Sequence, residues 1–114
     1  MNNTDDDVIL RLCASCQASP DWSALRASLK ATTFAVPVRL LPHDCMNGCA
    51  RPVSMALQGH ARATCFFTGV DPVADAPDIV ATLDAYIAAP AGWIADAQAC
   101  GRLRFCLVGR VPAL

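Results

Sequence analysis

Four cysteines in two closely spaced pairs are the residues of this sequence best suited to chemistry. Cys13 and Cys16 form a Cys-x2-Cys motif, and Cys45 and Cys49 form a Cys-x3-Cys motif. Thiolate sulfur is a soft ligand that selects zinc and iron–sulfur clusters, both of which take four such ligands. If the chain folds back so that the pairs meet, all four thiolates form one site. The pattern therefore predicts a metal or cluster site.

The composition limits the class of protein. The chain has 114 residues, 54% of them hydrophobic, so we expect a single domain over residues 1–114 with a polar, frayed terminus at residues 1–7. A net charge of -1 and a pI near 6.0 argue against nucleic-acid binding. No apolar run is long enough for a membrane span, and the polar start does not resemble a signal peptide. We therefore expect a cytoplasmic protein whose seven cysteines are reduced.

The first cysteine pair follows a predicted strand. Residues 8–13 read VILRLC, an apolar run of strand length that ends at Cys13. A helix is then expected to begin with Ser19 as N-cap and Pro20 at its first position, and to end near Ala31. Its apolar residues recur at helical spacing, so one face should pack against a sheet while Arg26 stays in solvent.

The second pair follows another predicted strand. Residues 34–41 alternate apolar and polar side chains, and Pro37 favours an edge position because it cannot donate a ladder hydrogen bond. We expect this strand to end at Pro42 and a polar loop over residues 43–52 to carry the cysteines. Two short strands, 53–57 and 63–67, then form a hairpin that turns at residues 58–60.

The last predicted element is a helix over residues 77–89. Its apolar positions lie on one face, and Asp75 or Ala76 is its expected cap. The tail at residues 101–114 mixes arginines with apolar residues and could be a short helix, a strand or an arm, so it has no assignment. The sequence thus predicts an α/β fold in which a βαβ unit is followed by a β-hairpin and a helix.

This order of elements resembles that of thioredoxin-like 2Fe-2S ferredoxins. In that family a Cys-x3-Cys type of loop follows a strand and leads through a Gly-Pro step into a hairpin and a helix. Here residues 45–49 stand in the place of the loop, Arg51-Pro52 in that of the Gly-Pro step, 53–57 and 63–67 in that of the hairpin, and 78–87 in that of the helix. The resemblance implies a thioredoxin-like mixed sheet flanked by helices. It also implies a 2Fe-2S cluster on Cys13, Cys16, Cys45 and Cys49 in a homodimeric electron-transfer or accessory protein that meets a redox partner protein and is not an enzyme.

A second resemblance covers nearly the whole chain. A bacterial family of small, predicted metal-binding proteins has the same Cys-x2-Cys and Cys-x3-Cys order and a similar ending, with Arg-Leu-Arg at residues 102–104 and Gly-Arg-Val-Pro at 109–112. Members of that family have been linked with tetrapyrrole and cobalamin pathways. The ferredoxins place a longer segment between their first two cysteines, whereas a two-residue spacing commonly chelates a single ion. Zinc binding with a structural or metal-handling role therefore stays open.

A thioredoxin-type dithiol oxidoreductase is the enzymatic alternative. Cys13 and Cys16 follow the first strand, where such enzymes keep a nucleophile at a helix N-terminus with a lowered thiol pKa. Against it, Pro20 predicts a helix start several residues beyond Cys16, which would remove the helix dipole from the thiol. The second cysteine pair would also have no role.

The remaining candidates have simpler explanations. Cys65 and Cys106 lie in apolar runs and are expected to be small buried side chains. Cys100 precedes Gly101 and has no clear placement, although it could be exposed. His43 lies two residues before Cys45 and could replace a thiolate or hydrogen-bond to a cluster, although a loop histidine is more often solvated. His60 is expected to be exposed in the hairpin turn.

Overall fold

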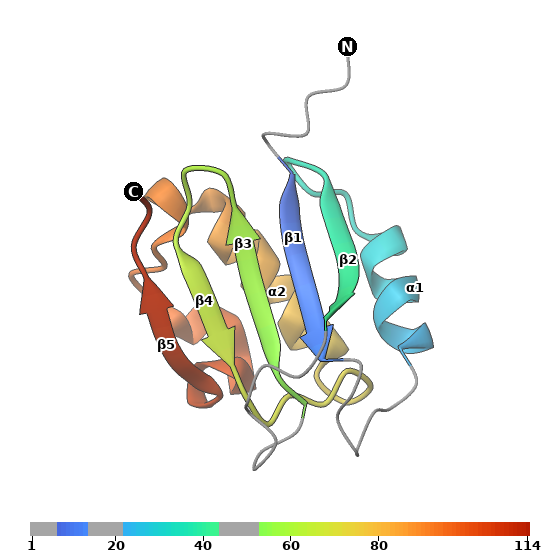
Figure 1. The fold of residues 1–114 in the computed structure, drawn as a ribbon. Coiled ribbons are helices and arrows are strands. Elements are labelled where there is room, and N and C mark those ends of the chain that lie inside the picture. Colours follow the sequence, from blue (N-terminus) through green and yellow to red (C-terminus); the bar gives the residue numbers. More distant parts are fainter. Residues whose placement is uncertain (1–6, 14–21, 44–52) are drawn as a thin grey trace.

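One five-stranded mixed sheet organises the fold (Figure 1). The computed structural model describes residues 7–13, 22–43 and 53–114. The strands, in chain order, are β1 (Val8–Cys13), β2 (Val38–His43), β3 (Met55–Gly59), β4 (Thr64–Phe67) and β5 (Leu107–Val111). Their order in the sheet is β2-β1-β3-β4-β5; β1 and β2 run parallel, and the other neighbouring pairs run antiparallel. The predicted α/β class with a mixed sheet is confirmed.

The predicted strand at residues 8–13 is confirmed as β1. Val8, Leu10 and Leu12 are fully buried because alternate side chains of a strand point to the same face. Helix α1 (Ser23–Ala31) ends where the sequence predicts. The helix begins later than expected, at Ser23. Trp22 is its N-cap and has non-helical torsion angles. The predicted cap, Ser19, lies outside the described residues.

The second strand differs from its predicted bounds. β2 starts at Val38, after Pro37, and runs through Pro42 to His43 instead of ending at Pro42. It lies at the edge of the sheet, as the sequence predicts. Because an edge strand needs ladder bonds on one side only, a proline without an N–H can lie within it. His43 is therefore the last residue of a strand, where the sequence places the start of a loop.

The hairpin of β3 and β4 is confirmed, but its turn is shifted. The turn spans residues 59–62, closed by the Arg62 N–H donating to the Gly59 carbonyl at 3.2 Å. The predicted turn residue Gln58 instead belongs to β3, where it pairs with Ile9 and accepts a hydrogen bond from Arg11 Nε at 2.7 Å. The pairing of β1 with β3 therefore continues past the buried residues of β3 to Gln58. His60 is exposed, as predicted.

Helix α2 (Ala76–Ala88) confirms the last predicted helix, with Asp75 at its N-cap. Ile79, Leu83 and Tyr86 are fully buried on its inner face. The Tyr86 hydroxyl donates a hydrogen bond to the Ala63 carbonyl, which ties the helix to the start of β4.

The unassigned tail forms two elements. A 3-10 segment, η3 (Ala97–Phe105), packs on α2 and leads into β5. Gly101 interrupts η3 with φ +60°, a region that side chains disfavour, and the Arg102 N–H donates to Asp78 Oδ2 at 3.1 Å. A shorter 3-10 segment, η2 (Pro90–Gly92), follows α2. The tail thus completes the sheet instead of extending away from it.

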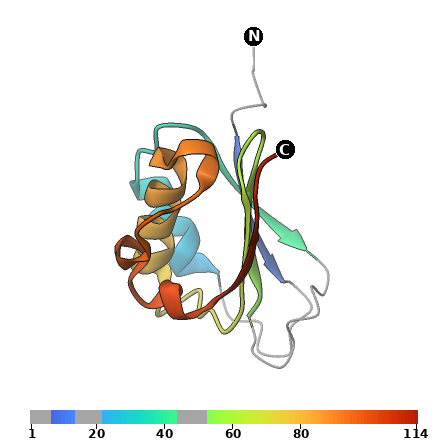
Figure 2. The ribbon, with the colours of Figure 1, turned by 90° about the vertical axis from the view of Figure 1, so that its left-hand side faces the viewer.

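All helical elements of the described chain lie on one face of the sheet (Figure 2). The core lies between this face and the helices. The flanking helices predicted from the sequence therefore form one layer. No helix among the described residues is long and apolar enough to cross a membrane.

Candidate functional site

Cys13 is the predicted ligand whose surroundings the structure describes. It is the last residue of β1, its side chain is 1% exposed, and it lies opposite His43, the last residue of β2. Its N–H donates to the Ser54 carbonyl at 3.0 Å, just before β3 begins. The ends of β1 and β2 and the start of β3 thus meet at one end of the sheet (Figure 1).

The other predicted ligands, Cys16, Cys45 and Cys49, lie outside the described residues. Within residues 7–13, 22–43 and 53–114, no three histidine, cysteine or acidic side chains converge as a metal site would require. The structure therefore brings Cys13 beside the exposed His43, and the set of four thiolates stays a prediction.

Ser54 is a site residue that the sequence analysis did not single out. Its side chain is fully buried, and its hydroxyl oxygen has no hydrogen-bond partner among the described groups. A buried hydroxyl without a partner costs roughly 1–3 kcal/mol, so this one, on a residue whose carbonyl accepts the Cys13 N–H, calls for an explanation. The sequence signal that could have identified Ser54 is its position between two apolar residues, Val53 and Met55.

The cysteines outside the two pairs are buried. Cys65 and Cys106 are each 1% exposed, as predicted, and burial raises the pKa of the Cys65 thiol. Cys100, whose exposure the sequence left open, is only 4% exposed, because η3 folds back onto α2. The Cys106 thiol lies 3.8 Å from the Gly69 carbonyl oxygen. These three thiols therefore pack as small buried side chains.

A second group of polar residues has a structural role. Asp75, at the N-terminus of α2, accepts hydrogen bonds from Arg102 Nε at 2.8 Å and from the Asp71 N–H at 2.8 Å. The Arg102 guanidinium holds the pKa of the Asp75 carboxyl below its usual value. A carboxyl held in its ionised form is a poor general base at neutral pH, and the contacts of this group fasten η3 to α2.

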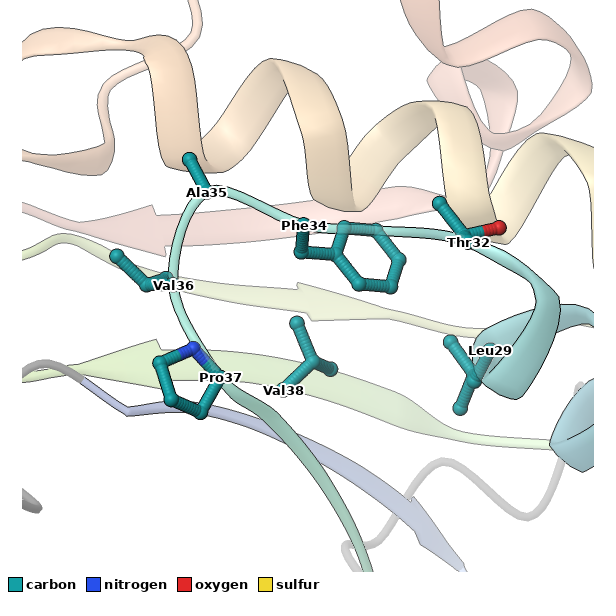
Figure 3. A pocket seen from close by; sticks show the side chains of 7 residues that line it. All are labelled: Leu29, Thr32, Phe34, Ala35, Val36, Pro37 and Val38. Carbon is teal, nitrogen blue, oxygen red and sulfur yellow. The ribbon is translucent and has the colours of Figure 1, made fainter.

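Two hollows differ in chemical character. The larger, about 350 Å³, lies between the end of α1 and the start of β2 and is lined by Phe34, Val36 and other uncharged side chains (Figure 3). Among its described lining residues, Thr32 supplies the one polar side chain, and none of these side chains is charged. The smaller, about 120 Å³, lies between β4, β5 and η3 and contains both thiol and guanidinium groups.

Comparison with known proteins identifies a family without assigning an activity. No curated protein and no solved structure matches the chain. Residues 10–113 match the family described as "Protein of unknown function (DUF1636)". This match covers the described residues except 7–9 and 114, and the matched range also contains both cysteine pairs. The chain therefore belongs to the DUF1636 family of proteins of unknown function.

Proposed function

We propose that this protein binds a 2Fe-2S cluster through Cys13, Cys16, Cys45 and Cys49 and acts as an electron carrier or cluster-dependent accessory protein, not as an enzyme. The observation that carries the proposal is the position of Cys13. Its strand neighbours are His43 on one side and Ser54 on the other, and these residues flank the segment that contains Cys45 and Cys49. When bound, a 2Fe-2S cluster supplies reversible one-electron chemistry.

Chain connectivity supports the same set of ligands. An extended chain spans at most about 3.6 Å per residue, so Cys16 lies within about 11 Å of Cys13 and Cys45 within about 7 Å of His43. Because Cys13 and His43 face each other across neighbouring strands, both cysteine pairs start from one end of the sheet. Four thiolates can then surround one centre without any rearrangement of the described strands.

The surroundings of Cys13 suit a metal-bound thiolate. Cys13 is buried, which keeps water from a cluster, and Ser54, whose carbonyl accepts the Cys13 N–H, has a hydroxyl donor without a described acceptor. Hydrogen bonds to thiolate or sulfide sulfur stabilise added negative charge and raise the reduction potential. Ser54 is thus suited to tune the centre. The need for reduced cysteines fits a cytoplasmic location.

The sheet supports a thioredoxin-like arrangement. We infer this fold from a parallel βαβ unit, β1–α1–β2, followed by an antiparallel hairpin beside β1 and by α2 on the same face as α1. Helix α1 begins at Ser23, ten residues after Cys13, so Cys13 does not belong to the first turn of this helix, where a thioredoxin-type nucleophile lies. The start of α1 thus favours a ligand over a thioredoxin-type nucleophile. The Cys-x2-Cys spacing keeps a single zinc ion as the second candidate.

We further propose that the carrier is a homodimer joined through β5. Among the described residues, five of the seven exposed large apolar side chains lie at positions 105–114: Phe105, Leu107, Val108, Val111 and Leu114. β5 is an edge strand, and an edge with unpaired backbone groups is a template for another strand. Antiparallel pairing of two β5 strands is self-complementary and leaves the β2 edge, next to the cysteine loops, open for a redox partner.

The test is the metal content of protein purified without oxygen. We expect visible charge-transfer absorption and two irons and two acid-labile sulfides per chain, lost when any of the four cysteines is changed to serine. Cys106→Ser is the matched control, because this buried thiol lies outside both pairs and should leave the cluster intact. A colourless protein with one zinc ion would support the second candidate, and insulin reduction that survives Cys45→Ser would support the oxidoreductase.

The dimer has a separate test. Analytical ultracentrifugation should give twice the chain mass for the unchanged protein and a monomer for Val108→Arg, because a charge at the paired edge opposes association. Val73→Arg is the control, because Val73 is also exposed, at 50% against 60% for Val108, but lies outside β5, before helix α2. A monomeric unchanged protein would contradict the β5 interface. So would a result in which Val73→Arg dissociates the dimer and Val108→Arg does not.

A further inference from the structure

The smaller cavity has an apolar interior beneath the edge of the sheet. It measures about 120 Å³ and lies between β4, β5 and the chain from Ile94 to Arg104. This chain runs behind β4 and β5 in Figure 1, on the helical face seen in Figure 2. Phe67, Ile94 and Leu107 supply apolar walls. An apolar cavity of about 150 Å³ accommodates benzene, so this one suits a ligand body of about four to six carbon atoms.

Two arginines give the cavity a positive charge. Arg110 pairs with Cys65 across β5 and β4, and its guanidinium lies 3.9 Å from the centroid of the Trp93 ring. Its Nη1 donates to the Ile94 carbonyl at 3.0 Å. The guanidinium of Arg104, also in the lining, lies 4.6 Å from the Phe105 ring centroid.

Neither guanidinium has a carboxylate partner in the described part of the chain. The ion pair found there joins Arg102 to Asp75, and no acidic side chain lines the cavity. The nearest acidic residue in sequence, Asp96, accepts a hydrogen bond from the Gln98 N–H at 3.0 Å and caps η3. Aromatic rings and a carbonyl therefore hold two cations in place, and their donors still lack an anion.

We propose that this cavity binds a small organic monocarboxylate, with its hydrocarbon body between Phe67 and Ile94 and its carboxylate against Arg104 and Arg110. The two thiols of the lining, Cys65 and Cys100, suit this ligand because they add weakly polar, polarisable surface. Burial raises the pKa of the Cys65 thiol, so it stays uncharged and does not repel an anion. Inorganic phosphate has no hydrocarbon body to fill the apolar interior, which favours the carboxylate.

Titration with butyrate, followed by amide chemical shifts, tests the proposal. We expect saturable shifts confined to β4, β5 and the segment from Ile94 to Arg104. Butyramide, which has the same shape without the charge, should bind at least tenfold more weakly. Acetate, which lacks two methylene groups, should bind roughly tenfold more weakly because each buried methylene contributes to affinity.

Substitutions separate the cavity from the rest of the surface. Arg104→Gln and Arg110→Gln should each weaken butyrate binding at least tenfold, and Ala97→Leu should abolish it by filling the cavity. Arg39→Gln is the matched control, because Arg39 is an exposed arginine on β2 at the opposite edge of the sheet. Since Arg110 also packs on Trp93, the spectrum of each variant must first show an intact fold.

Each outcome of these binding measurements either supports or overturns the proposed carboxylate site. Binding that needs both the carboxylate and the arginines supports the site. Equal binding of butyrate and butyramide, shifts that lie elsewhere, or no saturation by butyrate would overturn it. If Arg110→Gln fails to fold, the comparison of ligands on the unchanged protein and the Arg104→Gln variant still decide the question.

Discussion

The link between Arg102 and Asp75 is expected to supply a measurable part of the stability. Arg102 donates to both carboxylate oxygens of Asp75 and, through Nη2, to the Gly69 carbonyl at 2.8 Å. Asp75 is almost buried, with 5% of its side chain exposed, whereas 47% of the Arg102 side chain is exposed. Arg102→Ala would leave the carboxylate with one remaining donor, the Asp71 N–H.

The expected loss follows from this geometry. Breaking a fully buried ion pair costs about 3–5 kcal/mol, but solvent screens the exposed arginine, which lowers the expected value to about 2–3 kcal/mol. For a chain of this size, that corresponds to a fall in melting temperature of about 8–12 °C. The control is Arg104→Ala, because this exposed arginine has the Phe105 ring as its described contact and should cost at most about 0.5 kcal/mol.

The same variant has a pH signature. The hydrogen bond from Arg102 lowers the pKa of Asp75 from its ordinary 3.8, so the folded state binds this proton less readily than the unfolded state. The resulting stability is fully present above the unfolded pKa and is lost as pH falls through the lower folded value. Urea unfolding should therefore show a loss for Arg102→Ala that is constant near neutral pH and shrinks below about pH 4. A loss below about 1 kcal/mol, or one independent of pH, would refute the reasoning.

Three further predictions use the same unfolding and reactivity measurements. Tyr86→Phe should lower the free energy of unfolding by about 1–2 kcal/mol, because the buried Ala63 carbonyl loses its hydroxyl donor; an unchanged value would contradict this role. Gly101→Ala should cost at least about 2 kcal/mol in thermal unfolding, since φ is +60° and the new Cβ would lie 2.5 Å from Asp78 Oδ1. The three described cysteines outside β1 should react with a thiol reagent roughly 100-fold more slowly in the folded than in the unfolded protein, and equal rates would show that they are accessible.

Local patterns were sufficient for those elements that one segment specifies alone. The apolar run of β1 and the periodicity of α2, with Asp75 at its cap, predicted both elements to within a residue or two. The hairpin turn could not be placed, because the contact between Arg11 and Gln58 joins distant segments. β5 was not predictable either, since an apolar stretch with a central glycine becomes a strand by pairing with β4.

The candidate site shows the same division. Spacing alone identified the two cysteine pairs, and the end of β1 at Cys13 was predicted correctly. The burial of Cys100 could not be predicted, because it depends on η3 folding back at Gly101. The smaller cavity is lined by Cys65, Cys100 and Arg110, which come from separate elements. No local sequence motif could therefore predict it.

The positions of the two proposed sites predict that they work independently. Cys13 ends β1, whereas the cavity lies under β4 and β5; β3 separates these parts of the sheet, and each strand adds about 4.8 Å. Substitutions about 10 Å apart without shared partners usually have additive effects. Cys13→Ser should therefore remove the metal but leave butyrate affinity unchanged, and Arg110→Gln should do the reverse. A change in both properties from either substitution would mean that the strands between them transmit a conformational change, and the sites would then be two parts of one functional unit.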